Sequence, residues 1–406
     1  MGISKTKNGE NRGTGQFCAP TNGRCRMDLG FYNSYPEVDM GIIARSFDRV
    51  KQHIEPHLGI IPVIKGNAYG IGTEKIAEFL LPRCRDMMAC AQVLEADSIR
   101  RSGTDCEILI LGGIPAHALS KAVELDLQVP VFSPEGAQAL SDAAKKLGKR
   151  AKAHIKIETG LGRIGTKPGE ELEKLINTLS ALDNVDIDGV FTHFATATIV
   201  QSEYTLQQLE IFKQAMAQIR SAGISPRFVH CRNTGAASWL REDESTHIRA
   251  ATLLFGYPGM DDGSNLLSLG KEPLSWRAFV TNVTTLHKGE SCGYGRAFVA
   301  DKPTKVAIID VGYGDGLFRP LVTQHGPVLV GDKRARYLCC SMDQAFIDVT
   351  DIPVEIGDEV TMFGYSRGGA PLELSELELI AGHTMTYLQS LLTPRVKRIY
   401  INEEDI

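Results

Sequence analysis

The stretch PVIKGNAYGIG, residues 62–72, places a lysine directly after a run that has the composition of a buried strand. The apolar run ends abruptly at Lys65, and a loop with three glycines follows. Lysine is costly to bury, and its pKa shifts readily when it loses water. Either the strand simply ends there and Lys65 reaches solvent, or the protein needs an amine at this strand end. The rest of the sequence decides between these two interpretations.

Around this stretch, from about residue 38 to 256, short apolar runs alternate with amphipathic helical patterns. Repeated strand–helix units predict a parallel sheet with crossover helices. Seven or eight units in this length fit a closed (β/α)₈ barrel, of the TIM type, better than an open sheet. Strands are expected within 59–64, 86–93, 106–112, 127–132, 152–158, 188–194 and 227–231, and helices within 73–81, 117–125, 169–182 and 205–223.

After about residue 265 the pattern changes to strands joined by turns rich in Gly, Asp and Pro, and a helical pattern returns only near 374–392. The fold class is therefore α/β, with an N-terminal barrel followed by a C-terminal, mainly-β domain. We predict a flexible arm over residues 1–28, because this segment is polar and has little to bury. The barrel is expected over 29–262 and the second domain over 263–406.

The composition excludes several classes of protein. The chain has 406 residues, 43% of them hydrophobic, and a net charge of −5, so no nucleic-acid or membrane partner is expected. Nine cysteines, an odd number without module-like spacing, indicate reduced thiols in a cytoplasmic protein, and no metal site is expected. The N-terminal MGISKT matches the short myristoylation pattern, although most such matches arise by chance.

The residues that follow the barrel strands indicate the chemistry. The carboxyl ends of barrel strands meet on one face, where active sites of this fold lie. Cationic, imidazole and hydroxyl side chains on that face suit an anionic cofactor that carries a carbonyl group, and pyridoxal phosphate is the obvious candidate. These residues are, in chain order, Lys65, Arg163, His193, Asn233, Thr234 and Arg249.

One motif offers a different interpretation, since GLGRIG at residues 160–165 is a literal G-x-G-x-x-G after a predicted strand. A dinucleotide site needs these glycines to open the helix. Here Thr166 and Lys167 intervene, and Pro168 is expected to be the first helical residue. The acidic residue that should close the next strand is also missing, so a dinucleotide site is not favoured.

The sequence resembles the alanine racemase family, the fold-type III pyridoxal-phosphate enzymes. Nine motifs carry the resemblance in family order from about residue 30 to the C-terminus. The resemblance implies a barrel followed by a β domain, as the residue patterns do independently. The motifs are VIKGNAYGIG, KIETGLGRIG, GVFTHFATA, HCRNTGAAS, HIRAATLLFG, GESCGYGRAF, VGYGDGLFR, CCSMDQAFIDV and LLTPRVKRIY.

The resemblance implies a catalytic role for two residues. Lys65 would form the Schiff base with pyridoxal phosphate, and its released amine would act as a base on one face of the substrate Cα. Tyr294 would act as the second base on the opposite face, reaching the barrel of a partner subunit in a homodimer. Racemisation needs a proton removed from one face and another delivered to the other.

Arg249 matches the arginine that faces the pyridine nitrogen in this family. A guanidinium donates a hydrogen bond and leaves that nitrogen unprotonated, so the ring is a weaker electron sink. This favours a racemase over a related decarboxylase, which would carry a carboxylate there. A surface arginine that simply ends a strand is the alternative interpretation.

The resemblance also implies residues that bind the cofactor. Tyr69 would reach the phosphate, and Thr234 would hold it together with backbone N–H groups near Ala251 and Thr252. Asn233, His193 and His230 would line the cofactor site, although ordinary core histidines are an alternative for the last two.

Further residues would contact the substrate. Arg163 would bind the cofactor hydroxyl and the substrate carboxylate. Met342 and Asp343 would lie near that carboxylate across the dimer, and Tyr313 would stand at the substrate entrance. Lys156 matches a lysine that is carbamylated in some members, although an ordinary strand lysine is equally consistent with the sequence.

Several departures from the family pattern leave the substrate open. Ala250-Ala251 follows Arg249 where Pro-Gly is usual, Phe255 replaces a common tyrosine, and Thr198 replaces an aspartate. Pocket changes of one methylene discriminate by only about 1–3 kcal/mol. Interconversion of L- and D-alanine is the leading prediction. A serine or broad-specificity racemase, a decarboxylase and a non-catalytic carrier of pyridoxal phosphate are the alternatives.

Overall fold

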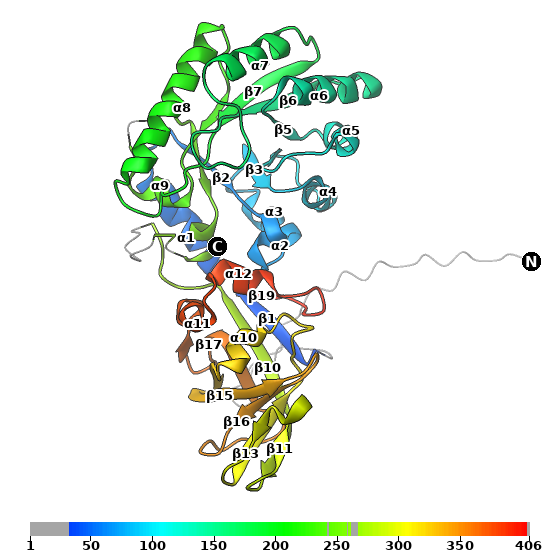
Figure 1. The fold of residues 1–406 in the computed structure, drawn as a ribbon, viewed down its shortest axis with the longest axis vertical. Helices are drawn as coiled ribbons and strands as arrows, with labels where there is room; N and C mark the ends of the chain where they lie inside the picture. The colour runs from blue at the N-terminus through cyan, green and yellow to red at the C-terminus, as the bar shows by residue number, and fades with distance from the viewer. Residues whose placement is uncertain (1–31, 242, 258, 261–266, 404–406) are drawn as a thin grey trace, which may run out of the picture. The chain divides into compact units, whose positions relative to one another are not determined.

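The structure, a computed structural model, describes residues 32–241, 243–257, 259–260 and 267–403. Eight parallel strands form its first half (Figure 1). Six of them, β3 to β8, pair in chain order, and β2 pairs with β9. The circle closes where the Ile64 N–H donates to Ala89 O (2.8 Å) and the Arg249 N–H donates to Arg232 O (3.0 Å). The strands are β2 (Gly59–Pro62), β3 (Met87–Cys90), β4 (Glu107–Ile110), β5 (Gln128–Val131), β6 (Ala151–Lys156), β7 (Val185–Phe191), β8 (Phe228–His230) and β9 (His247–Ala250).

Helices alternate with these strands, as the sequence pattern predicts. Local capping fixes where several of them begin. Asp39 accepts from the Ile42 N–H (3.1 Å) at the start of α1, and Ser133 caps α6 with Pro134 as its first residue. The helices are α1 (Met40–His53), α2 (Lys65–Tyr69), α3 (Thr73–Leu80), α4 (Val93–Arg101), α5 (Ala116–Glu124), α6 (Pro134–Leu147), α7 (Glu170–Ser180), α8 (Glu203–Ser221) and α9 (Thr234–Trp239), with a short 3₁₀ turn, η1, over Thr252–Phe255.

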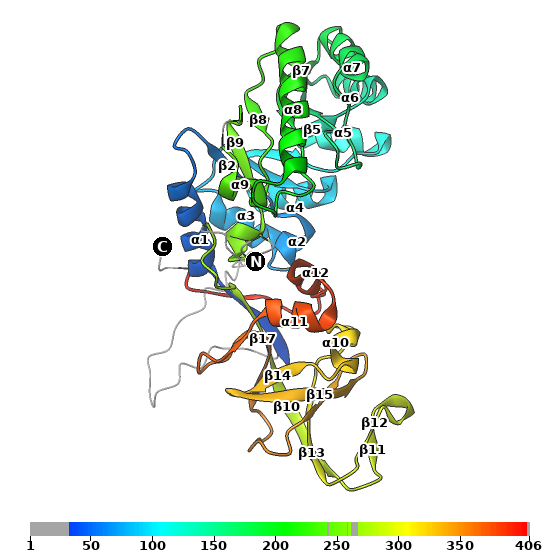
Figure 2. The same cartoon turned by 60° about the vertical axis from the view of Figure 1, so that its left-hand side comes forward.

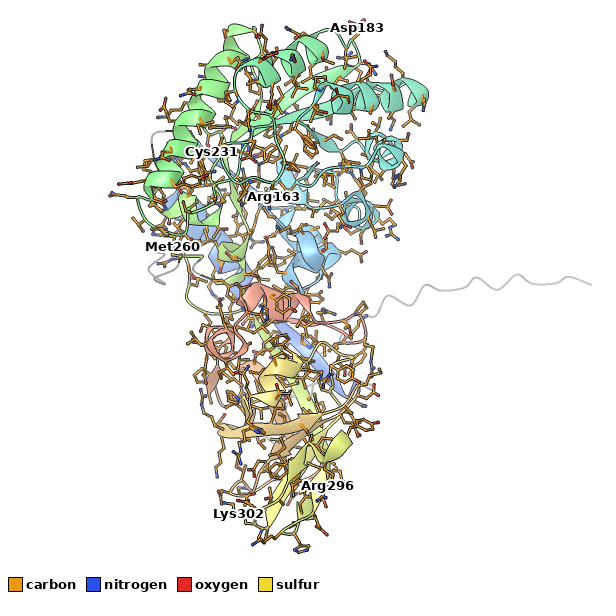
Figure 3. The ribbon with its side chains drawn as sticks, viewed as in Figure 1. Arg163, Asp183, Cys231, Met260, Arg296 and Lys302 are labelled. Carbon is orange, nitrogen blue, oxygen red and sulfur yellow. The ribbon has the colours of Figure 1, made fainter. Side chains whose placement is uncertain are left out.

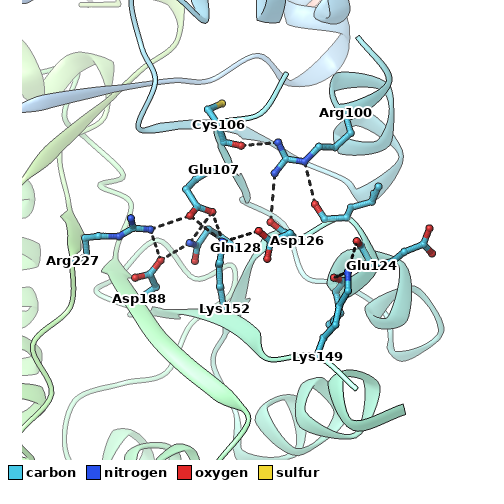
Figure 4. A network of polar contacts seen from close by, with 12 residues as sticks. Arg100, Cys106, Glu107, Glu124, Asp126, Gln128, Lys149, Lys152, Asp188 and Arg227 are labelled. Atoms are coloured by element: carbon cyan, nitrogen blue, oxygen red, sulfur yellow. Dashed lines mark hydrogen bonds and ion pairs between the residues drawn. The ribbon is translucent and has the colours of Figure 1, made fainter. Parts of the chain in front are cut away.

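The two ends of the barrel have different chemistry. At the start of the strands, charged and amide side chains pair with one another across neighbouring strands (Figure 4). Lys152 lies 3.0 Å from Glu107, and Arg227 lies 2.8 Å from Asp188. Between the ends lies a small apolar plug of buried side chains that includes Ile61, Met87 and Leu109. Since the apolar plug closes the barrel between its two ends, the carboxyl end of the strands is left for the predicted site.

The second half of the chain is a sheet of order β18-β17-β14-β15-β16-β13-β10-β1-β19, in which β17 also pairs with β10. A separate hairpin, β11 (Ser291–Cys292) with β12 (Phe298–Val299), carries the 3₁₀ turn η2 (Tyr294–Arg296) at its tip (Figure 2). The other elements are β1 (Ser34–Asp39), β10 (Leu274–Leu286), β13 (Thr304–Ile309), α10 (Arg319–Thr323), β14 (Pro327–Val330), β15 (Lys333–Cys340), β16 (Ala345–Asp348), β17 (Glu359–Tyr365), β18 (Pro371–Leu372), α11 (Leu374–Ala381), α12 (Met385–Ser390) and β19 (Ile399–Ile401).

Two local expectations need correction. We assigned the segment around Ser34–Asp39 to the barrel, but β1 pairs antiparallel with β10 and parallel with β19. A buried ion pair joins these strands, because Arg277 Nη2 lies 3.0 Å from Glu37. Pro168 does not open a helix, because α7 begins at Glu170 after a turn. The domain division at 262/263 stays a prediction, and residues 1–28, with MGISKT, Cys18 and Cys25, lie outside the described residues.

No helix among the described residues is long and apolar enough to cross a membrane.

A buried carboxyl makes the stability of this fold depend on pH. Burial raises the pKa of Glu272 to about 8, against the opposing effect of the Leu374 N–H that it accepts at 3.0 Å. The folded protein therefore holds a proton that the unfolded chain releases above pH about 4.3. The free energy of unfolding contributed by this group should fall as pH rises from about 4.3 through 8.

Urea denaturation at several pH values checks this expectation. Glu272→Gln keeps an acceptor for the Leu374 N–H and should flatten the decline, whereas Glu355→Gln, at an exposed carboxylate that does not act on the pKa of Glu272, should leave the curve unchanged. Parallel curves for the wild type and Glu272→Gln would contradict the assignment.

Candidate active site

Lys65 lies at the mouth of the barrel, where β2 ends. The four residues after it have positive φ, at 62° for Gly66, 55° for Asn67, 49° for Ala68 and 56° for Tyr69. A run of left-handed residues is unfavourable for L-amino acids by roughly 1–2 kcal/mol each, so the surrounding structure must hold it in place. Partial burial lowers the pKa of the Lys65 amine, and the nearby Arg163 and Arg249 lower it further. A lowered pKa makes an amine available as a nucleophile or base near neutral pH.

Glu95, which was not predicted as a site residue from the sequence, holds the left-handed turn in place. Its carboxylate accepts from the Gly66 N–H (2.6 Å), the Ala91 N–H (2.7 Å) and the Gln92 N–H (3.1 Å). It therefore ties the peptide after Lys65 to the end of β3. The three-residue spacing from Gln92 to Glu95, typical of a helix capping box, was the available signal.

Glu95→Ala should lower the free energy of unfolding by about 1–3 kcal/mol, because three N–H groups lose a charged acceptor. Urea denaturation measures this loss. Glu124→Ala removes a carboxylate from an exposed ion pair with Lys121 and should cost less than about 1 kcal/mol. Equal losses of unfolding free energy in the two variants would contradict this role of Glu95.

Arg249 is buried at the end of β9 and forms no ion pair with a carboxylate among the described residues. Its Nη1 donates to His230 Nδ1 (2.9 Å) and His230 O (2.7 Å), and its Nη2 donates to Thr192 O (2.8 Å). Burial lowers its pKa to about 10, so it remains protonated near neutral pH. In the described part of the chain its Nε donates to nothing, which leaves one directed N–H group for a ligand atom.

Two histidines, His230 and His154, extend the hydrogen-bond network of Arg249 into the barrel. Because Arg249 can only donate, His230 Nδ1 accepts, and its Nε2 is left to donate to His154 Nδ1 at 3.4 Å. Burial lowers the pKa of His154 to about 3 and holds that of His230 well below its usual value, so both rings are neutral. His230 was predicted as a site residue from the sequence and His154 was not, although the two-residue spacing from His154 to Lys156 on one strand placed both on the same face.

The remaining basic side chains gather around Arg249. Lys156 is 3% exposed, its ammonium lies 4.4 Å from the centre of the Phe191 ring, and burial holds its pKa well below the usual value. His193 Nδ1 lies 3.4 Å from Arg249 Nη2, and burial, reinforced by that arginine, lowers its pKa. Arg163, on the loop after β6, is exposed and is labelled in Figure 3. Arg249, Arg163 and Lys156 lie close together with no ion pair to a carboxylate among the described residues, and such a cluster of basic side chains suits a ligand with negative charge.

A second cluster lies where β8 and β9 end. Thr234 Oγ1 accepts from the Ala251 N–H at 3.1 Å. The backbone of Gly259 passes so closely that a Cβ there would lie 2.4 Å from the Thr234 methyl group and 3.1 Å from Thr252 Oγ1. The structure thus brings together Thr234, Ala251 and Thr252. Asn233 lies beside them, but its side chain caps α9 by accepting from the Ala236 N–H at 3.2 Å. Tyr69 packs against Phe255 at 5.6 Å between ring centres.

The glycine-rich loop 160–165 is already occupied by a side chain of this protein. The Glu158 carboxylate accepts from the Gly160 N–H (2.5 Å) and the Arg163 N–H (3.1 Å). These backbone hydrogen bonds outweigh the effect of burial and lower the pKa of Glu158. Because these N–H groups already donate to Glu158, they are not available to bind a dinucleotide phosphate. This agrees with the prediction that the loop is not a dinucleotide site.

The predicted residues of the second domain form a separate group. Tyr294 is 86% exposed at the tip of the β11–β12 hairpin. Tyr313 lies near Met342, because the Gly314 N–H donates to Met342 O (2.9 Å), and Asp343 lies 2.7 Å from Arg395. Among the described residues no hydrogen bond or ion pair joins this group to Lys65 or Arg249. One chain therefore does not bring the predicted residues of its two halves together.

A cavity of about 440 Å³ lies at the opposite end of the barrel. Two of its lining residues, Arg227 and Glu107, form an ion pair at 3.1 Å, which Figure 4 shows, and none of the predicted site residues lines it. The ion pairs fit a role in stability, and the chemistry of the predicted site lies elsewhere. The cavity is lined by Arg85, Asp86, Arg100, Asp105, Cys106, Glu107, Asp126, Arg227, Phe228 and His247.

Comparison with known proteins decides the family. The model of the alanine racemase N-terminal domain matches residues 38–258, and that of the alanine racemase C-terminal domain matches residues 273–400. The chain belongs to the alanine racemase family. It is 31% identical to an alanine racemase of Methanococcus maripaludis over 91% of this chain and 98% of the relative. It is 34% identical to one of Geobacter sulfurreducens over 90% of this chain and 96% of the relative.

Solved structures of the family agree with the fold. An alanine racemase of Clostridium difficile 630 superposes with a TM-score of 0.85 at 27% identity, covering 92% of this chain and 97% of the other. An alanine racemase of Bacillus anthracis with bound L-Ala-P gives 0.86 at 28%, covering 93% and 97%. A histidine racemase of Leuconostoc mesenteroides gives 0.83 at 25%, covering 92% and 99%. The predicted family and fold class are confirmed, and these relatives are racemases, a class of isomerase.

Proposed function

We propose that this protein is a pyridoxal-phosphate-dependent racemase that interconverts L- and D-alanine. The observation that carries the proposal is the environment of Arg249, a buried cation whose Nη atoms hold the histidines and strand carbonyls while its Nε stays available. An arginine in this position favours a racemase over a decarboxylase. The β half with its exposed Tyr294 argues against a non-catalytic carrier of the cofactor.

The residues present fit pyridoxal phosphate. Lys65 would bind its aldehyde through an amine whose pKa is already lowered, and the Arg249 Nε–H would face the ring nitrogen. Thr234, Thr252 and the Ala251 N–H would hold the phosphate with Tyr69, and Asn233, His193 and His230 would line the site. Bound there, the cofactor withdraws electrons and so makes the Cα proton of an amino acid acidic.

Two bases would then remove and return the Cα proton. Lys65 would take or give it on one face of Cα, and Tyr294 of a second copy on the other. Arg163 and the partner's Met342 and Asp343 would surround the substrate carboxylate, with the partner's Tyr313 at the entrance, and Lys156 would orient Arg163. Carbamylation of Lys156 is part of the proposal, and it would convert a buried amine, whose pKa burial already lowers, into an anion beside Arg163 and Arg249.

Solvent-deuterium incorporation at Cα tests the proposal directly. Purified enzyme loaded with pyridoxal phosphate is incubated in D₂O with a panel of L- and D-amino acids. Exchange with inversion for alanine is the expected result. Exchange only with serine, histidine or another residue would keep the mechanism and overturn the substrate. Release of CO₂ would indicate a decarboxylase, and no exchange at all would leave a cofactor carrier.

A homodimer with shared sites follows from the separation of Lys65 and Tyr294, and mixing two inactive variants tests it. Lys65→Ala and Tyr294→Phe subunits, unfolded together and refolded, should regain up to a quarter of wild-type activity. Each mixed dimer has one intact pair of bases, and about half of the dimers are mixed. No recovery would contradict sharing. A cytoplasmic location also stays part of the proposal, supported by the odd number of cysteines.

A further inference from the structure

Two cysteines face each other beneath the hairpin that carries Tyr294. Cys292 Sγ, in β11, lies 3.7 Å from Cys339 Sγ, in β15. Cys339 is 6% exposed, whereas Cys292 is partly exposed. The hairpin backbone packs directly on this pair, because a Cβ at Gly293 would lie 2.6 Å from Cys339 Sγ. The two thiols are separated by 47 residues and meet only through the fold.

The position of this pair connects it to the second base. Cys292 is two residues before Tyr294, and β15 continues from Cys339 into the turn that holds Met342. β15 is fixed on both sides by β14 and β16, whereas in the described part of the chain β11 pairs only with β12. A bond between the two sulfurs would therefore move the hairpin more than the sheet.

We propose that Cys292 and Cys339 are a redox-sensitive thiol pair that a low-molecular-weight disulfide oxidises to an intrachain disulfide, and that this bond lowers turnover by displacing Tyr294. The formation of the bond is independent of the proposed function, while its effect on turnover rests on it.

The chemistry is ordinary thiol–disulfide exchange. The Cys292 thiolate attacks one sulfur of glutathione disulfide, forms a mixed disulfide and releases one glutathione thiolate. The Cys339 thiol loses its proton to solvent and attacks the Cys292 sulfur, and the second glutathione thiolate leaves. Two protein thiols lose two electrons in total, and one glutathione disulfide is reduced to two glutathiones.

The surroundings favour Cys292 as the attacking thiol. It is the more exposed of the two, and the hydrogen bond from Cys339 lowers its pKa. The same contact, followed by burial, raises the pKa of Cys339. Cys339 therefore stays protonated at first and acts as the resolving thiol in the second step. A disulfide has an S–S length of about 2.05 Å, so the sulfurs must approach by about 1.6 Å. A displacement of this size at a catalytic group reduces turnover by up to about 10²-fold.

The experiment treats the native holoenzyme with glutathione disulfide, blocks free thiols, digests the protein without reduction and maps the peptides by mass spectrometry. We expect a peptide that joins Cys292 to Cys339, a fall in racemisation of at least tenfold, and recovery of both on adding dithiothreitol. Cys292→Ser should keep its activity and resist the oxidant. The control Cys340→Ser removes a neighbouring, partly exposed thiol and should behave like the wild type.

Each other outcome overturns part or all of the proposal. Absence of the joined peptide rejects the thiol pair. A joined peptide with unchanged racemisation rejects the control of turnover. Inactivation that persists in Cys292→Ser assigns the effect to another thiol. An enzyme that racemises no amino acid before oxidation rejects the proposed function and the control of turnover together, while the peptide map still decides whether the pair forms.

Discussion

Replacing Lys65 by alanine should lower racemisation by at least about 10³-fold, the largest effect that we expect from any single change. The variant loses both the amine that binds the cofactor aldehyde and one of the two bases, and a positioned base alone contributes about 10²–10⁴-fold. Initial rates of D-alanine formation from L-alanine, followed by chiral chromatography, measure the loss. The fold should survive, because the Lys65 side chain makes no hydrogen bond among the described residues and Glu95 holds the adjacent peptide.

Two controls make this result specific. Lys51→Ala removes an exposed lysine in α1 and should leave the rate unchanged. Added methylamine should restore part of the activity of Lys65→Ala, because a free amine can take the place of the missing base. Wild-type turnover in Lys65→Ala would remove the basis of the proposed mechanism.

Replacing Tyr294 by phenylalanine should lower racemisation by about 10²–10⁴-fold while leaving the other half of the reaction intact. The hydroxyl is lost, but Lys65 remains. One enantiomer should therefore still exchange its Cα proton for solvent deuterium with retention of configuration. Chiral chromatography coupled to mass spectrometry separates exchange from inversion. The stability should not change, because the side chain is 86% exposed.

Tyr387→Phe is the matched control, since it removes another exposed tyrosine hydroxyl that donates to no described residue. It should retain full activity. If Tyr294→Phe and wild type inverted alanine at the same rate, Tyr294 would not be the second base.

Much of the barrel could be predicted because its signals are local. Each strand is a short apolar run followed by a helix with its own start signal, such as Ser133-Pro134 before α6. The observed strands β2 to β8 fall within, or within a few residues of, the predicted runs. The segment of β1 was placed in the barrel range because its true partners, β10 and β19, lie more than 200 residues away in sequence. A hydrophobic pattern tells that a strand exists, but not which distant strand it pairs with.

The candidate site also has a part that could be predicted from the sequence and a part that only the structure shows. Lys65, Arg249 and Thr234 could be named from the sequence because each ends a strand of a fold whose active face lies there. The sequence alone thus determined the family, the barrel and most of the groups that would hold an anionic cofactor. Only the tertiary structure decided what fixes those groups: Glu95 on the peptide after Lys65, His154 beneath His230, and Cys339 against Cys292. The physical reason is the distance along the sequence between the interacting residues. A strand and its end residue follow from neighbouring side chains, whereas these contacts join segments that come together only when the chain folds.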